Sequence, residues 1–204
     1  MMMIPENRGD IQMLFNEGTF EEFLNKRVKN QFIELYSLPI DIFSNSSFSK
    51  KKKAKEASDC EIIKPIHIHF LSKEFDMIEN PRGSKKQVAR ISYEFKHSSD
   101  LNLFGIKPHG YNFKLTDYHP VICTTKLNKD IIAFNFITEC NNKMFSNELY
   151  NESERFRKEV TEKLNITVKY INAEISSYND GLYDKALAII TDRKKMFQLE
   201  KQNN

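Results

Sequence analysis

Two histidines separated by a single residue are the first candidates for a chemical role. His67 and His69 fall within residues 61–71, where apolar side chains recur at even-numbered positions. In a strand, side chains two positions apart share a face, so both imidazoles could bind one divalent metal ion. A small metal-dependent hydrolase or nuclease is therefore one hypothesis, although no carboxylate or cysteine stands at a recognised ligand spacing from the pair. The alternative is two polar residues on the wet face of an amphipathic strand.

A short basic run is the second candidate site. It lies in a stretch rich in serine and lysine, residues 44–59, which predicts a mobile loop. Its members are Lys50, Lys51, Lys52, Lys53 and Lys55. These lysines could contact an anionic partner, which would make the protein a nucleic-acid adaptor. The 31 basic and 28 acidic residues are otherwise spread evenly along the chain, whereas nucleic-acid binding usually concentrates basic groups on one face. A solvated loop is the alternative.

No pattern in the sequence identifies an enzyme. Cys60, Cys123 and Cys140 lie far apart, without the close spacing of a zinc ribbon or a redox pair. A nucleophilic cysteine needs a nearby histidine or helix N-terminus that lowers its pKa, and the sequence indicates neither. With 6 glycines there is no glycine-rich phosphate loop. We therefore expect a non-catalytic protein with no cofactor.

The elements that must position these residues begin with a helix. Residues 1–18 are predicted to be a loose segment. Thr19 and Glu22 have the spacing of a capping box, and apolar residues then recur every three or four positions to about residue 37. Pro39 ends this helix, because proline removes a helical donor.

An antiparallel sheet is predicted next. Residues 87–97 alternate between apolar and polar, which indicates one buried and one wet face. Residues 121–125 and 131–138 form the best hairpin, and shorter strands are predicted at residues 38–43 and 111–116. Helix and sheet together predict one α+β domain over residues 19–140, with the N-terminal helix packed on the sheet.

The C-terminal part is predicted to be a helical hairpin over residues 146–200. Asn179, Asp180 and Gly181 form a strong helix stop within a long apolar periodicity. Two helices joined by so short a loop should pack antiparallel. The apolar seam of this hairpin is the candidate surface for a partner protein or a second copy. Its residues are Leu164, Val168, Ile171, Ile175, Ile189 and Phe197.

The sequence also predicts where the protein resides. No apolar run is long enough for a membrane span, and the first ten residues lack the basic and then apolar pattern of a signal peptide. Dispersed cysteines are typical of a reducing compartment. We expect a cytoplasmic protein.

The second half of the chain resembles a known class of module. Residues 99–104 read SDLNLF and are followed by Lys107 and Pro108, the hairpin, and a long helix that contains INAEISSYNDGL at residues 171–182 and leads to Arg193 and Lys194. This order is similar to the N-terminal module of bacterial multi-domain conflict-system proteins. Those anti-phage-like proteins carry a C-terminal restriction-endonuclease-like or TIR-like effector domain.

The resemblance implies a sensor, regulatory or protein-interaction module that signals through its helical hairpin. Its partner would be a fused or separate effector, or a second copy bound through the hairpin. The sequence ends at Asn204, where the effector would begin, so the resemblance assigns no catalytic residue to this chain.

Overall fold

The computed structural model confirms an α+β fold with an antiparallel sheet and two long C-terminal helices. It describes residues 14–15, 17–28, 32–78, 88–115, 122–140 and 146–203. The elements are β1 (Gly18–Thr19), α1 (Phe20–Val28), α2 (Ile33–Tyr36), η2 (Ile40–Ser44), α3 (Lys50–Glu61), β2 (Ile68–Ile78), β3 (Val88–His97), η3 (Leu101–Gly105), β4 (Ile106–Lys107), β5 (Ile122–Leu127), β6 (Ile131–Glu139), α4 (Asn147–Asp180) and α5 (Leu182–Asn203).

The chain forms two compact units. The first combines Met1–Phe20 with Ile66–Asn172, and the second combines Glu21–Pro65 with Ala173–Asn204. This division differs from the predicted one, in which residues 19–140 formed one domain and residues 146–200 a separate hairpin. Helix α4 contributes residues to both units.

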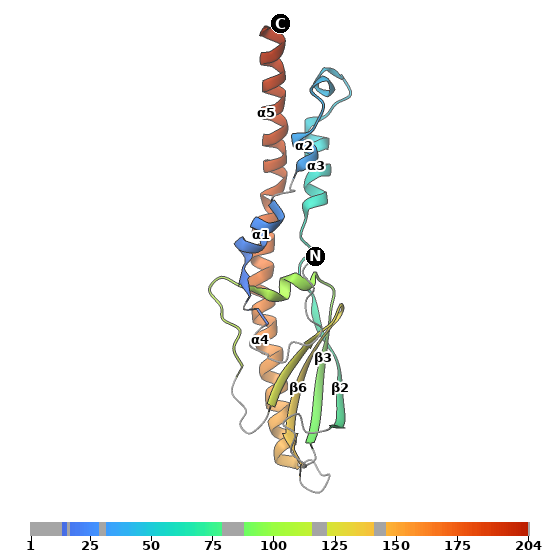
Figure 1. The fold of residues 1–204 in the computed structure, drawn as a ribbon, viewed down its shortest axis with the longest axis vertical. Helices are drawn as coiled ribbons and strands as arrows, with labels where there is room; N and C mark the ends of the chain where they lie inside the picture. The colour runs from blue at the N-terminus through green and yellow to red at the C-terminus, as the bar shows by residue number, and fades with distance from the viewer. Residues whose placement is uncertain are drawn as a thin grey trace. The chain divides into compact units, whose positions relative to one another are not determined.

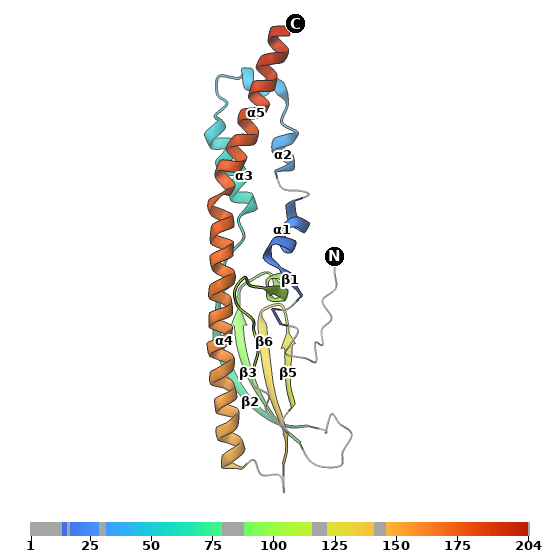
Figure 2. The same ribbon diagram turned by 90° about the vertical axis from the view of Figure 1, so that its left-hand side faces the viewer.

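The first unit is a four-stranded sheet with α4 along one face (Figures 1 and 2). The strand order is β2-β3-β6-β5, and all neighbours are antiparallel. The predicted strand at residues 87–97 and the predicted hairpin are confirmed as β3 and β5–β6. The ring of Phe156 on α4 lies 6.2 Å from that of Tyr93 on β3 and 5.7 Å from that of Phe136 on β6. The central strands therefore pack directly on α4.

Part of the segment predicted to be loose is anchored to this unit. Leu14 and Phe15 are buried, and the Phe15 N–H donates to the carbonyl oxygen of Phe104 at 2.7 Å. The Phe15 ring also packs 5.3 Å from that of Phe113, which lies in an irregular segment. The strand predicted at residues 111–116 is therefore absent from residues 111–115, which the structure describes. Most of the loose segment predicted at residues 1–18 lies outside the described residues.

Two asparagines of α4 hold residues 62–67, which form no strand. The Asn172 side chain accepts from the Ile66 N–H at 2.7 Å and donates to the Ile66 carbonyl at 2.8 Å. Asn179 does the same for Ile63, at 3.0 and 2.8 Å. Each amide thus replaces a neighbouring strand for one residue whose side chain is buried. The first of these asparagine clamps lies within the first unit and the second lies within the second unit.

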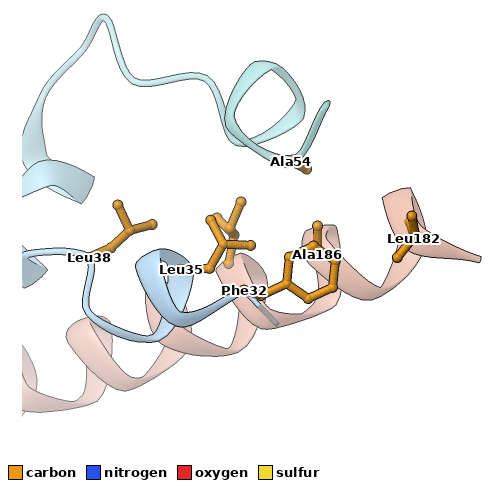
Figure 3. Close-up of a cluster of buried hydrophobic side chains, with 7 residues drawn as sticks. Phe32, Leu35, Leu38, Ala54, Leu182 and Ala186 are labelled. Carbon is orange, nitrogen blue, oxygen red and sulfur yellow. The ribbon is translucent and has the colours of Figure 1, made fainter. Parts of the chain in front are cut away.

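The second unit is a helical cluster around α5. Its core unites α2, α3 and α5, as Figure 3 shows, through seven buried residues. They are Phe32, Leu35, Leu38, Ala54, Leu182, Ala186 and Ile190. The N-terminal helix predicted on the sheet is instead split into α1 and α2, and α2 packs against α5 in this unit. The split lies next to Phe32, whose φ of 58° is left-handed and cannot continue a helix.

The mobile loop predicted at residues 44–59 is wrong, because most of it is helix α3. The Ser49 hydroxyl caps this helix by accepting from the Lys52 N–H at 3.3 Å. Ala54 is buried in the core that α3 shares with α5, and Ser58 is also buried. Small residues suffice for this contact, so the usual signal of large apolar side chains is missing. The edge strand predicted at residues 38–43 is also wrong, since η2 occupies Ile40–Ser44.

The two C-terminal helices are present with the predicted boundary, but they form a bent pair rather than an antiparallel hairpin (Figures 1 and 2). Gly181 does not adopt the positive φ that ends a helix, and helical hydrogen bonding continues past it. Its carbonyl accepts from the Lys185 N–H at 3.2 Å. One residue is too short a loop for a reversal, so α5 packs on α2 and α3 instead.

None of the helices in the described part of the chain combines the length and the apolar character that a membrane crossing requires.

Each asparagine clamp should contribute measurably to stability. Asn172→Ala and Asn179→Ala each leave two backbone groups unpaired, which should lower the free energy of unfolding by about 1–3 kcal/mol. Chemical unfolding followed by circular dichroism measures this loss. Asn165→Ala, an exposed change on the same helix, is the matched control and should stay within about 0.5 kcal/mol of the wild type. Equal stability of all three variants would show that the clamps contribute nothing.

His97, the last residue of β3, is buried. His97 donates from Nε2 to the carbonyl oxygen of Asn128 at 3.1 Å, and its ring lies 4.7 Å from that of Phe104. Burial lowers the pKa of His97 below its ordinary value, and the Asn128 carbonyl and the Asp130 carboxylate offset this only in part. The folded state therefore favours the neutral imidazole.

This burial predicts a loss of stability in mild acid. Below about pH 6.5 the unfolded chain binds a proton at His97 that the folded chain resists, so the free energy of unfolding should fall as the pH drops from 7 to 5. His97→Gln, which keeps a donor for Asn128, should flatten this dependence. His67→Gln, at an exposed position, should leave it in place. Urea unfolding at a series of pH values makes the comparison, and identical slopes for both variants would exclude His97 as the cause.

Candidate functional site

Strand β2 carries exposed apolar side chains at the edge of the sheet. Phe70, Leu71, Phe75 and Met77 are 43%, 47%, 54% and 39% exposed. The strand pairs with β3 on one side and stands at the edge of the sheet. An edge strand also presents backbone N–H and C=O groups that a further strand could bind. Exposed apolar side chains beside such groups are typical of a site for protein association.

A β-bulge at Leu71 determines which side chains of β2 share a face. Phe70 lies opposite Phe95 and Ser72 opposite Glu94, so Leu71 is the extra residue. After the bulge, one face carries Lys73, Phe75 and Met77, opposite Tyr93, Ile91 and Ala89 of β3. Because Tyr93 packs on α4, this is the face that α4 covers. Ser72, Glu74 and Asp76 occupy the other face.

An ionic cluster connects β2 to α4. The Nζ atom of Lys73 lies 2.6 Å from Oε1 of Glu154, and Nε of Arg157 lies 2.8 Å from Oε2 of the same carboxylate. The Nζ atom of Lys73 also lies 4.1 Å from the centre of the Tyr150 ring, and the Cζ atom of Arg157 lies 5.6 Å from the centre of the Phe70 ring. One carboxylate thus holds two cations, and each cation covers an aromatic ring.

The pKa values in this cluster favour the charged forms. Partial burial alone would raise the pKa of Glu154, but the hydrogen bonds from Lys73 and Arg157 and their positive charges lower it below its ordinary value. Partial burial alone would lower the pKa of Lys73, but Glu154 raises it above the ordinary value. Both groups are therefore ionised and paired at neutral pH. Such a pair suits fixing a strand in place rather than exchanging protons with a substrate.

The opposite face of β2 is acidic. Ser72 donates to Oε2 of Glu94 at 2.8 Å, and Asp76 forms an ion pair with Arg90 at 2.9 Å. Glu74 lies between Ser72 and Asp76 on this face, opposite Ser92 of β3. Along residues 72–78 and the β3 residues opposite them, this face holds three carboxylates and one guanidinium.

The structure does not build a metal site around the predicted histidines. His67 precedes β2, whereas His69 lies within it opposite Lys96, and both are exposed. Across the described ranges, no three His, Cys, Asp or Glu side chains gather closely enough to hold a metal ion. Two exposed imidazoles without a third ligand do not support the metal-dependent hydrolase.

The predicted lysine run lies on a helix rather than in a loop. Four of its members form the first turn of α3, where the positive end of the helix dipole disfavours them. Lys53 lies 4.0 Å from Glu56, and Lys55 lies 2.8 Å from Asp59. Carboxylates of the same helix thus offset part of the positive charge. The geometry gives no separate support to a nucleic-acid adaptor.

The predicted interaction seam is core. Leu164, Ile171 and Ile175 are buried within the chain's own fold, and Val168 is half-buried. Ile189 packs against the helical core of the second unit, and the Phe197 ring lies 6.2 Å from that of Phe43. The seam is therefore largely covered by the chain's own fold and does not form an open docking surface.

Burial also sets the character of one cysteine. Cys140 is buried at the end of β6, and burial raises the pKa of its thiol. A raised pKa favours the unreactive thiol form.

The ionic cluster was missed by the sequence analysis, although partial signals exist. Residues 72–78 alternate between the two faces, but the bulge at Leu71 shifts the phase relative to residues 61–71. Glu154 and Arg157 have the three-residue spacing that brings side chains together on a helix. No pattern indicates that Lys73, eighty-one positions away from Glu154, completes the cluster.

Breaking the cluster should loosen β2 at a small cost in global stability. Glu154→Gln removes the charge that both cations share, and should lower the free energy of unfolding by about 1 kcal/mol, as for a partly exposed pair. The wild-type contribution should persist above the unfolded-state pKa of Glu154 and disappear as the pH falls through its lowered folded-state value. Hydrogen exchange at β2 and urea unfolding measure the two effects. Glu162→Gln, exposed on the same helix, is the control, and equal β2 protection in both variants would contradict the role of the cluster.

A scan of protein-family models, a search of curated proteins and a search of solved structures each find no match to this chain. The functional conclusion therefore depends on the residues and geometry described above.

Proposed function

We propose that this protein is a non-catalytic protein-interaction module with a sensing or regulatory role, and that β2 is where it binds its partner. The observation that carries this proposal is the edge strand itself. Phe75 and Met77 remain 54% and 39% exposed on the face that α4 only partly covers. Binding a protein segment there would bury this apolar surface and pair the strand's outer backbone groups.

The ionic cluster supports the same proposal, because it prepares the strand for binding. Lys73 and Arg157 are fixed by Glu154, so the aromatic rings beside them are held in place before a partner arrives. A pre-ordered surface loses less conformational entropy on association than a flexible one. Through this cluster, binding at β2 would also act on α4, since Glu154 and Arg157 belong to that helix.

Other contacts of α4 support the proposed regulatory role. The same helix carries Asn172 and Asn179, which fix residues 62–67. A partner that changes the packing of β2 on α4 would act on a helix that contributes to both units. The resemblance to modules of bacterial conflict systems supports a place in such a system in the cytoplasm, with a fused or separate effector as the protein partner.

Site-specific photo-crosslinking tests this function. A photoreactive amino acid at Phe75 should crosslink in the source cell to one distinct polypeptide, identified by sequencing the crosslinked peptide. The same amino acid at Tyr170, 43% exposed on α4, is the control for exposure alone. Phe75→Glu should reduce recovery of that polypeptide at least about ten-fold, because it places a charge in the buried centre of the interface.

Two results would overturn the proposal. One is the same set of crosslinks from both positions, which would indicate random collision. The other is undiminished recovery by a folded Phe75→Glu variant, with folding checked by circular dichroism.

A further inference from the structure

We infer that the partner of β2 is an extended segment in which basic and apolar residues alternate, and that it adds to the sheet as a fifth strand. The inference rests on the proposed function, since it names the chemistry of the segment that β2 binds. It follows from the exposed edge, the two distinct faces of β2 after the bulge, and the charges on each face.

The edge of β2 favours a strand over a helix as the occupant. The residues of β2 are mostly exposed, from one end of the strand to the other. Its apolar side chains lie before and after the bulge and do not line a closed groove. Pairing with an edge strand satisfies the backbone groups of both segments at once. Side chains of the added strand would then point alternately to the α4 face and to the acidic face.

The acidic face selects the charge of the occupant. Glu74 and Asp76 point to it, with Glu94 beside them on β3. Arg90, the cation in this group, is paired with Asp76, so the face keeps a net negative charge. A strand paired with β2 would place every second side chain directly opposite these carboxylates. Basic residues at those positions would form cross-strand ion pairs, whereas acidic residues would repel.

The α4 face selects apolar residues at the intervening positions. The side chains there are Phe75 and Met77, and the positive charge of Lys73 is already paired with Glu154. The added strand therefore needs no acidic residue opposite Lys73. Apolar side chains at these positions would extend the packed face of the sheet beyond its present edge.

The same charges disfavour a second copy of this chain as the occupant. In a symmetric antiparallel pair centred on Glu74, that residue would face Glu74 of the second copy. Centred on Phe75, the pair would place Glu74 opposite Asp76, and centred on Asp76 it would place that residue opposite itself. Each of these registers, which overlap most of residues 72–78, puts like charges directly opposite one another.

Peptide binding to the full chain tests the inference. The probe is a labelled, capped heptapeptide in which lysine and valine alternate, followed by fluorescence anisotropy at physiological salt. We expect saturable binding, with protection from hydrogen exchange along β2. A peptide with glutamate in place of lysine should bind at least about ten-fold more weakly, as expected for the loss of two cross-strand ion pairs and their replacement by repulsion. A peptide of the same composition with its lysines grouped at one end should also bind more weakly.

Charge reversal on the protein provides the matched test. The double variant Glu74→Lys with Asp76→Lys should lose the lysine peptide and gain the glutamate peptide. The control double variant Glu162→Lys with Glu200→Lys makes the same change in net charge at exposed positions on α4 and α5, and should keep the wild-type preference. Circular dichroism confirms that each variant is folded.

The backbone contacts can be tested independently. In a strand, the N–H groups of alternate residues point to the same edge. A peptide N-methylated at every lysine and one N-methylated at every valine should therefore differ, with one of the two losing binding and the other retaining it. Loss in both, or in neither, would overturn the fifth-strand geometry.

The outcomes separate this inference from the proposed function. Failure of the alternating peptide to bind, together with a distinct crosslink from Phe75, would overturn the partner chemistry and leave the interaction function standing. Failure of both experiments would overturn both proposals. Sedimentation that shows a dimer, with crosslinks from Phe75 to a second copy, would overturn the inference by identifying another occupant.

Discussion

Helix α4 packs over the central strands of the sheet and leaves the outer strands less covered. A helix about 10 Å wide cannot span four strands spaced about 4.8 Å apart. The contacts of Phe156 with Tyr93 on β3 and Phe136 on β6 mark this centre. Side chains on the same face of β2 are then left at the rim, where Phe75 and Met77 remain exposed. The exposed edge thus follows from the width of one helix against the width of four strands.

The rim is ordered by charge rather than by burial. A surface ion pair contributes little to global stability, so the Lys73–Glu154–Arg157 cluster is better understood as a positioning device. It keeps the long side chains of Lys73 and Arg157 over aromatic rings. Without Glu154, these two cationic side chains would be free to change rotamer. The asparagine clamps act similarly on residues 62–67, where a side-chain amide substitutes for a missing strand. In both places, polar side chains of α4 fix a neighbouring segment to the helix.

The sequence predicts those parts of the fold in which periodicity is unbroken. Strand β3, the β5–β6 hairpin and the extent of α4 each follow from a regular alternation or a regular apolar stripe. Predictions fail where local and tertiary signals disagree. Helix α3 begins with four lysines that oppose its dipole and buries small residues such as Ala54, so its contact with α5 leaves no strong pattern. At Gly181 the sequence correctly indicates the boundary between two helices. The backbone there nevertheless keeps a helical conformation, so the chain bends and does not reverse.

The candidate site was hidden for a related reason. A single bulge at Leu71 reverses the faces of β2, so the alternation of residues 61–71 cannot be extended to residues 72–78. The same bulge separates the exposed strand into two short runs, which makes it a poor template for uncontrolled pairing. Glu74 and Asp76 add a charge barrier against copies of the same chain. An edge strand whose carboxylates disfavour self-pairing, yet which carries exposed apolar side chains, resists aggregation and still suits a partner of opposite charge. The charges that disfavour pairing of β2 with a second copy are therefore also those that favour the proposed partner.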